Sequence, residues 1–336
     1  MDWRGITRLT ALAVAITLGG TALTQPALAN TAQTPAATAD AAPAETMTTI
    51  TGPTQVLAMQ TDAYRRMTVA VQLNGQGPYR FMVDTGAQST VLSHALADQL
   101  QLGRRATATL VGMSSTRQVP TARIDQLTFG NHSASDARAA LVDGANIGGA
   151  DGILGLDSLQ DRRVLLDFSR LEMQVAHVSE RVTTRGYDIV VRARRRNGQL
   201  IIASAEIDGV RTAVLIDTGA QGSIGNAALQ QRLRRRGTVA QTEMIDINGV
   251  LGTGDVQRVR HLDFGRAQIS NFAITFTPSP TFAALDLVDE PALILGMNEL
   301  HLFERVAIDF PSRRVLLDLP EGAGLPGADA FSRFAD

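Results

Sequence analysis

The sequence lacks two residue types that carry much of enzyme chemistry. None of its 336 residues is Cys, and all 31 of its basic residues are Arg, because Lys is also absent. Without Cys there can be no disulfide, thiolate zinc site, iron–sulfur cluster or thiol nucleophile. Without Lys there can be no Schiff base and no Walker-type phosphate loop. Any catalysis must therefore rely on carboxylates, hydroxyls or the five His residues.

The chain also lacks an excess of charge of either sign. Its 31 basic and 33 acidic residues leave a formal net charge of −2, which gives no electrostatic case for nucleic-acid binding. The His residues show no HExxH or other metal-ligand spacing, and no Ser lies in a GxSxG motif. We therefore expect no metal, no cofactor and no serine hydrolase. Hydrophobic residues make up 44% of the sequence, enough for the core of one large or two medium domains.

The first 29 residues are typical of a signal peptide. Arg4 and Arg8 stand at the start of an apolar stretch over 9–23, and a small-residue cleavage site ends at Ala29. The stretch is too short and too interrupted for a membrane span of about 20 residues. We therefore expect an exported protein, periplasmic or secreted, with no membrane span once residues 1–29 are removed.

Two segments have the composition of flexible chain. Residues 30–62 form a linker rich in Ala, Thr and Pro, where burial cannot offset the entropy cost of ordering. Residues 321–336 form a similar tail. Between them, β-branched runs alternate with turn signals, which predicts mainly β structure with short helices at 93–100 and 226–236.

The central segment contains an internal repeat. Residues 81–88 recur at 214–221, and both copies hold Asp-Thr-Gly-Ala-Gln after three apolar residues. An apolar-apolar-Gly element follows each copy, ending at Gly155 and at Gly296. The order of the matches is kept while their spacing grows, as loop insertions would produce. The repeat predicts two homologous lobes, 63–180 and 181–320.

Each copy of the repeat delivers one carboxylate at the end of an apolar strand. Asp84 and Asp217 are each followed by Thr-Gly-Ala, which predicts a tight turn where Gly allows close backbone approach. Burying a carboxylate is costly, so its recurrence favours function over two ordinary Asx turns. If a pseudo-twofold axis relates the lobes, the two Asp meet there, share one proton and can activate a water. Asp157 is expected only to cap a short helix.

At these residues the sequence resembles the retropepsin-like aspartic proteases, in particular bacterial exported members with two lobes in one chain. The family signature is an apolar pair before Asp-Thr-Gly-Ala and a later apolar-apolar-Gly element, and both occur twice here. The resemblance implies an all-β fold of two lobes related by a pseudo-twofold axis. It implies an endopeptidase in which Asp84 and Asp217 are catalytic. The residues that would support the two catalytic turns are Thr85, Gly86, Ala87, Thr218, Gly219 and Ala220.

The same family covers its active site with β-hairpin flaps. Candidate flap turns lie around Gly112 and Met113 in the first lobe and around Asn248 and Gly249 in the second. Gly-containing hairpin signals are common in β proteins, so two ordinary surface hairpins are the alternative.

These features predict a protease that acts as a monomer on protein or peptide substrates, because both half-sites lie in one chain. An extended substrate would bind as an added strand, with side-chain pockets giving selectivity. One alternative is a periplasmic peptide-binding protein without turnover, and another is an envelope scaffold that keeps a protease-like cleft. The intact Asp-Thr-Gly in both lobes favours the enzyme, because a binding protein needs no pair of adjacent carboxylates.

Overall fold

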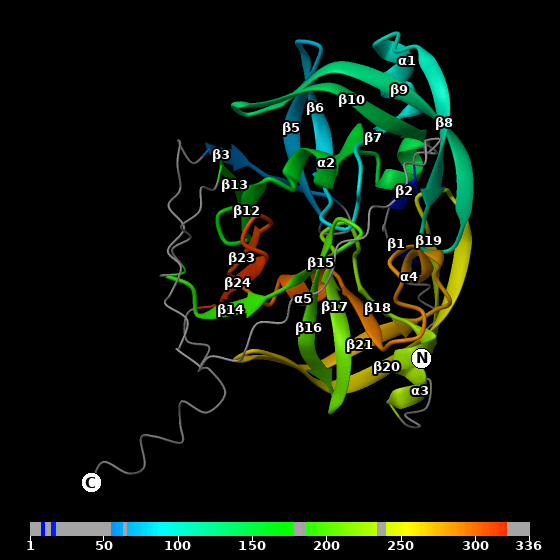
Figure 1. Cartoon of the computed structure of the whole chain (residues 1–336). Coiled ribbons are helices and arrows are strands. Elements are labelled where there is room, and N and C mark those ends of the chain that lie inside the picture. Colours follow the sequence, from blue (N-terminus) through cyan, green and yellow to red (C-terminus); the bar gives the residue numbers. More distant parts are fainter. Residues whose placement is uncertain are drawn as a thin grey trace, which may run out of the picture.

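The computed structural model describes residues 8–10, 15–17, 55–62, 66–177, 184, 186–233 and 240–320 (Figure 1). The described residues form mostly β-strands and a few short helices, so the predicted all-β fold with two similar lobes is confirmed. The expected tail and most of the expected linker and signal peptide lie outside the described residues. Among the described residues, no helix is long and apolar enough to cross a membrane.

Each lobe is built on a nine-stranded sheet, and the two sheets have the same strand order. The N-lobe order is β2-β8-β9-β10-β7-β11-β6-β5-β4, and the C-lobe order is β1-β19-β20-β21-β18-β22-β17-β16-β15. The N-lobe strands are β2 (Ala15–Thr17), β4 (Gln60–Thr61), β5 (Met67–Leu73), β6 (Gln76–Val83), β7 (Val91–Ser93), β8 (Arg104–Val111), β9 (Thr116–Phe129), β10 (His132–Val142) and β11 (Gly152–Leu154). The C-lobe strands are β1 (Arg8–Thr10), β15 (Arg194–Arg196), β16 (Gln199–Ile207), β17 (Val210–Ile216), β18 (Ser223–Gly225), β19 (Ala240–Ile245), β20 (Leu251–Phe264), β21 (Ala267–Phe276) and β22 (Ala292–Leu295). The two copies of the sequence repeat thus fold into sheets with the same strand order.

A third sheet of six strands joins the lobes, three strands from each. Its order is β14-β24-β23-β12-β13-β3, and β12 pairs antiparallel with β23 across the lobe boundary. Within this pairing, Arg163 and Asp309 lie opposite each other and form a buried ion pair of 3.2 Å. The strands are β3 (Gln55–Ala58), β12 (Arg162–Asp167), β13 (Glu172–His177), β14 (Ile189–Arg192), β23 (Arg305–Asp309) and β24 (Arg314–Asp318).

One expectation about the N-terminal segments differs from the structure. Residues 55–61, expected to belong to the flexible linker, form β3 and β4. The reason is long-range pairing, because β3 receives its backbone hydrogen bonds from β13, more than 100 residues away. In addition, two short strands, β1 and β2, lie within the expected signal peptide and pair with β19 and β8.

The helices are short and begin at well-defined caps. Helix α1 (His94–Gln99) follows Ser93, whose side chain accepts a hydrogen bond from the Leu96 amide. Helix α3 (Ala227–Arg232) follows Asn226, which caps it in the same way. Both were expected from the sequence, and the second ends at Arg232, before the predicted end at residue 236. The other helices are η1 (Gly144–Ile147), α2 (Leu156–Leu159), α4 (Pro280–Ala284) and α5 (Met297–Leu300).

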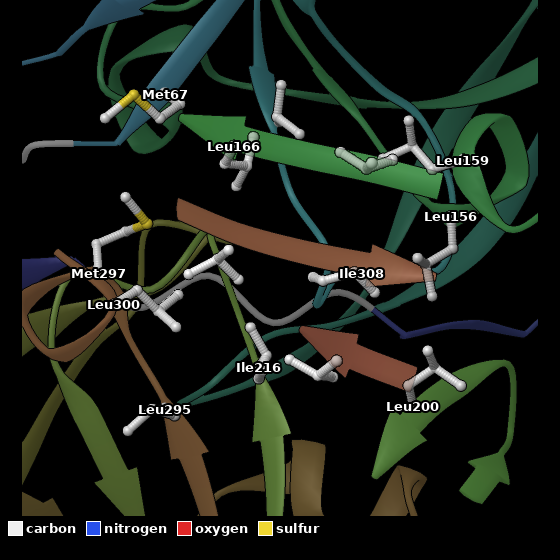
Figure 2. Close-up of a cluster of buried hydrophobic side chains, with 14 of the residues drawn as sticks. Met67, Leu156, Leu159, Leu166, Leu200, Ile216, Leu295, Met297, Leu300 and Ile308 are labelled. Atoms are coloured by element: carbon white, nitrogen blue, oxygen red, sulfur yellow. The ribbon is translucent and has the colours of Figure 1, made fainter. Parts of the chain in front are cut away.

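One hydrophobic core runs through both lobes and the sheet between them (Figure 2). Met67, Leu156 and Leu166 reach it from the N lobe, and Ile216 and Leu300 reach it from the C lobe. Because apolar burial is the main favourable term in folding, this shared core holds the lobes in one arrangement. The catalytic turns predicted from the sequence therefore face each other across a packed interface.

Candidate active site

Asp84 and Asp217 occupy equivalent positions at the ends of β6 and β17. The Asp84 amide donates to the Leu154 carbonyl at 3.1 Å, and the Asp217 amide donates to the Leu295 carbonyl at 3.0 Å. Each Asp is therefore fixed to the strand that ends just before Gly155 or Gly296 in its own lobe. Both side chains are fully buried, and they lie close enough for the charge of Asp84 to raise the pKa of Asp217. The structure thus brings the two sequence-predicted Asp residues together.

The turn after each Asp presents backbone amides to one carboxyl oxygen. Asp84 Oδ1 accepts hydrogen bonds from the amides of Gly86 at 2.8 Å and Ala87 at 2.9 Å. Asp217 Oδ1 accepts from the amides of Gly219 at 2.8 Å and Ala220 at 3.1 Å. In the described structure the Oδ2 atoms of both Asp residues are buried without a hydrogen-bond partner. These two Oδ2 atoms are the positions where a proton and a water can be held.

The two Gly residues of the turns are required by the close approach of the lobes. A Cβ added to Gly86 would lie 2.5 Å from the carboxyl carbon of Asp217, and one added to Gly219 would overlap the carboxyl of Asp84. No side chain larger than hydrogen fits at either position. Each Gly therefore makes room for the carboxyl of the opposite lobe.

Thr85 and Thr218 exchange hydrogen bonds across the lobe boundary. Thr85 Oγ1 donates to the Ile216 carbonyl at 2.9 Å, and Thr218 Oγ1 donates to the Val83 carbonyl at 2.7 Å. In return, each hydroxyl accepts the amide of the other Thr, at 3.0 Å and 3.2 Å. Both Thr residues are buried. This exchange links the two Asp-Thr-Gly-Ala turns by four hydrogen bonds.

Burial raises the pKa of both Asp carboxyls. It raises the pKa of Asp84 to about 6, against the opposing effect of the amides of Gly86 and Ala87. For Asp217, burial and the negative charge of Asp84 together raise the pKa well above its ordinary value. As pH rises, the pair therefore loses one proton at a lower pH than the other, because the first negative charge opposes the second ionisation. Between the two pKa values of the pair, one carboxyl is ionised and the other is protonated.

The candidate flaps are two hairpins, one from each lobe, whose tips meet at the lobe boundary next to α4 (Figure 1). The hairpin β8–β9 belongs to the N lobe, and the hairpin β19–β20 belongs to the C lobe. Ser115 Oγ donates to Asp246 Oδ2 at 2.7 Å, and the Asn248 amide group donates to Ser115 Oγ at 3.0 Å. Gly112 stands against the same Asp246 carboxyl. Gly249 has a positive φ of 73° at the other tip.

Each flap tip also inserts one apolar side chain into the opposite lobe. Met113 is fully buried in a cluster whose other members all come from the C lobe, among them Leu215 and Ala220. Ile247 is fully buried in a cluster whose other members all come from the N lobe, among them Met82 and Ala87. Both clusters include the Ala of a catalytic turn. The hairpins are therefore closed over the site, which is not the arrangement of two independent surface hairpins.

Sequence reasoning missed several residues that support the two Asp-Thr-Gly-Ala turns. Asp157, expected only to cap a helix, accepts hydrogen bonds from the amide and the hydroxyl of Thr90, both at 2.9 Å. In the C lobe, Glu299 accepts from Ser223. The available signal was a hydroxyl residue six positions after each catalytic Asp and an acid shortly after each Gly element.

A further missed residue reaches across the lobes from the β15–β16 hairpin. The buried amide group of Gln199 donates to the Gly86 carbonyl at 2.6 Å. In the opposite direction, Gln88 donates to the Asn197 carbonyl at 2.8 Å. The N-lobe catalytic turn is therefore held partly by the C lobe. Among the described residues, no group of three or more His, Asp or Glu side chains could hold a metal ion.

Comparison with known families agrees with this geometry. Residues 69–161 match the family described as "gag-polyprotein putative aspartyl protease", and residues 203–298 match the family described as "aspartyl protease". No curated protein matches the sequence. Each matched segment holds one Asp-Thr-Gly-Ala turn and the Gly element that follows it. The chain therefore carries two aspartyl protease family domains, one in each lobe.

Proposed function

We propose that the protein is an aspartic endopeptidase that hydrolyses peptide bonds with a water held between Asp84 and Asp217. The observation that carries this proposal is the pair of buried carboxyls whose Oδ2 atoms have no hydrogen-bond partner in the described structure. A carboxyl pair with raised pKa values holds one proton over a wide pH range and so supplies a base and an acid together.

The reaction follows from the protonation states of the pair. Ionised Asp84 takes a proton from the water as the water oxygen attacks the carbonyl carbon, and Asp217 gives its proton to the carbonyl oxygen. The product of this step is a tetrahedral diol, with Asp84 protonated and Asp217 ionised. When the C–N bond breaks, Asp84 protonates the leaving nitrogen and a diol hydroxyl returns a proton to Asp217. One proton remains in the pair, and no covalent enzyme intermediate forms.

The closed flap tips add a requirement for substrate entry. Met113 and Ile247 must leave the opposite lobes before an extended peptide can reach the carboxyls. We therefore propose that both hairpins act as flaps. We also propose that the protein works as a monomer, because one chain supplies both carboxyls, and that it is exported, because residues 1–29 have the pattern of a signal peptide.

The proposal is tested by incubating the purified chain with a denatured protein across pH 3 to 8, beside Asp84→Asn. We expect fragments from the unmodified chain, most of them at pH 6 and above, and none from the variant. Cleavage by both proteins would exclude the carboxyl pair as the catalyst. Saturable peptide binding without fragments would favour the alternative of a binding protein.

A further inference from the structure

Glu299 is a buried carboxyl that the proposed reaction does not use. It lies on α5 with 6% of its surface exposed, and its Oε2 accepts a hydrogen bond from Ser223 Oγ. Burial raises the pKa of Glu299 to about 7, against the opposing effects of Ser223 and of its own backbone amide. Burying a carboxyl costs free energy unless the carboxyl is hydrogen-bonded. The hydrogen-bond partner of Glu299 therefore indicates what this side chain does.

Ser223 connects Glu299 to the catalytic loop of the C lobe. The loop runs from Asp217 to Ser223 and lies along residues 295–299. The Met297 amide donates to the Ala220 carbonyl, and the Asn298 amide donates to the Gln221 carbonyl, both at 2.9 Å. Ser223 Oγ accepts the Gly296 amide at 3.2 Å and donates to Glu299. The Glu299–Ser223 bond thus closes the far end of a loop that begins at Asp217.

The N lobe has the same support built from different residues. There Thr90 stands six residues after Asp84, as Ser223 stands six residues after Asp217. Thr90 is bonded by Asp157, which lies two positions after its Gly element, whereas Glu299 lies three positions after Gly296. The acidic residue is Asp in one lobe and Glu in the other, and it lies at a different helix position. In both lobes it is hydrogen-bonded to the hydroxyl residue six positions after the Asp of the turn. Both lobes therefore keep a carboxyl support behind the catalytic turn.

We propose that Glu299 is a positioning residue for Asp217 and acts through Ser223. The inference rests on the proposed protease function for its effect on rate. Asp217 Oδ1 is fixed by the amides of Gly219 and Ala220, so movement of the loop moves the carboxyl relative to Asp84. A displacement of about 1 Å at a reacting group can cost about a hundredfold in rate.

The experiment compares Glu299→Ala, Glu299→Gln and Ser223→Ala, with Leu302→Ala as the matched control. Leu302 follows the same helix, and its side chain is 51% exposed. We expect Glu299→Ala and Ser223→Ala to lower kcat by about tenfold or more with KM little changed, because substrate contacts are intact. Glu299→Gln keeps an oxygen that accepts the Ser223 bond, so it should keep most of the activity.

Two further results decide whether Glu299 acts through Ser223. The double variant Glu299→Ala/Ser223→Ala should be no slower than Ser223→Ala alone, because Ser223→Ala already removes the bond to Glu299 together with the bond from the Gly296 amide. An unchanged kcat in Glu299→Ala, or a Glu299→Gln variant as slow as Glu299→Ala, would overturn the proposal.

Amide hydrogen exchange at Gly219 and Ala220 tests the positioning without any substrate. We expect faster exchange at both amides in Glu299→Ala and wild-type rates in Glu299→Gln. If the unmodified chain cleaves no peptide, this measurement still tests whether Glu299 holds the loop. Equal exchange rates in all variants would overturn the proposal even if the protein is a protease.

Discussion

Replacing Thr218 by Val removes two of the four hydrogen bonds between the Asp-Thr-Gly-Ala turns and almost preserves the side-chain volume. The lost hydroxyl donates to the Val83 carbonyl and accepts the Thr85 amide, and both of these groups belong to the N lobe. Val83 and Thr85 are buried, so water cannot replace the missing partner. Each unsatisfied buried group costs about 1–3 kcal/mol, which gives about 4 kcal/mol for the pair. This is a large part of the net stability of a typical folded domain, which is about 5–15 kcal/mol.

Thr218→Ser is the matched control, because it keeps the hydroxyl and removes only the methyl group. Loss of one buried methyl costs about 1 kcal/mol, so we expect the Ser variant to be more stable than the Val variant by about 3 kcal/mol. Urea unfolding followed by circular dichroism measures the free energy of unfolding of both variants. We expect the dependence of that free energy on urea concentration to be the same as in the unmodified chain. Val and Ser variants of equal stability would refute the reasoning. A Val variant that fails to fold beside a folded Ser variant would agree with it.

The remaining predictions concern pH and flap opening. Peptide cleavage should rise through pH 6 and fall again at higher pH, because the reaction needs ionised Asp84 and protonated Asp217, and Asp84 has the pKa of about 6. Glu299→Gln should stabilise the protein above pH 7 by about 3 kcal/mol relative to the unmodified chain. The reason is that the pKa of Glu299 rises from 4.5 to about 7 on folding, so the native state loses stability as pH rises through that interval. A Ser115→Cys/Asn248→Cys variant, which contains the only two Cys residues in its chain, should be inactive when oxidised and active after reduction.

Each of these three predictions can be contradicted by a specific result, and two of them have a control variant. A cleavage optimum below pH 4 would show that the carboxyl pair has ordinary pKa values. For Glu299, the control is Glu206→Gln on the exposed face of β16, and an equal gain in both variants between pH 5 and pH 8 would contradict the assignment. For the flaps, the Ser115→Cys variant alone should respond to neither oxidant nor reductant. Full activity of the oxidised double variant would show that the tips need not separate.

The two Asp-Thr-Gly-Ala turns could be predicted from the sequence because the pattern that forms them is local. An apolar strand, an Asp, and a Thr-Gly-Ala turn occupy consecutive positions, and the repeat supplies the second copy. The strand order repeats for the same reason, since each lobe holds the same succession of strands and turns. The family resemblance supplied the role of Thr85 and Thr218 in joining the turns, and the structure places their hydroxyls across the lobe boundary.

The contacts that could not be predicted join residues far apart in the chain. Gln199 reaches the turn at Gly86 from the other lobe, and no local pattern marks it. Met113 and Ile247 are buried because each flap tip contacts the opposite lobe. The hydrophobic pattern of the sequence does not indicate this contact. Glu299 escaped notice because its counterpart in the N lobe is displaced by one helix position. Composition alone likewise could not show that residues 55–61 complete two sheets.

The central claim is that one chain builds one carboxyl pair from its two lobes. It is tested most directly by measuring cleavage of a denatured protein by Asp84→Asn, by Asp217→Asn, and by an equimolar mixture of the two variants, at pH 6. Each variant keeps only one of the two carboxyls, and the lobes of one chain share a hydrophobic core, so we expect no cleavage in any of the three samples. Cleavage by either single variant, or activity that appears only in the mixture, would contradict the claim.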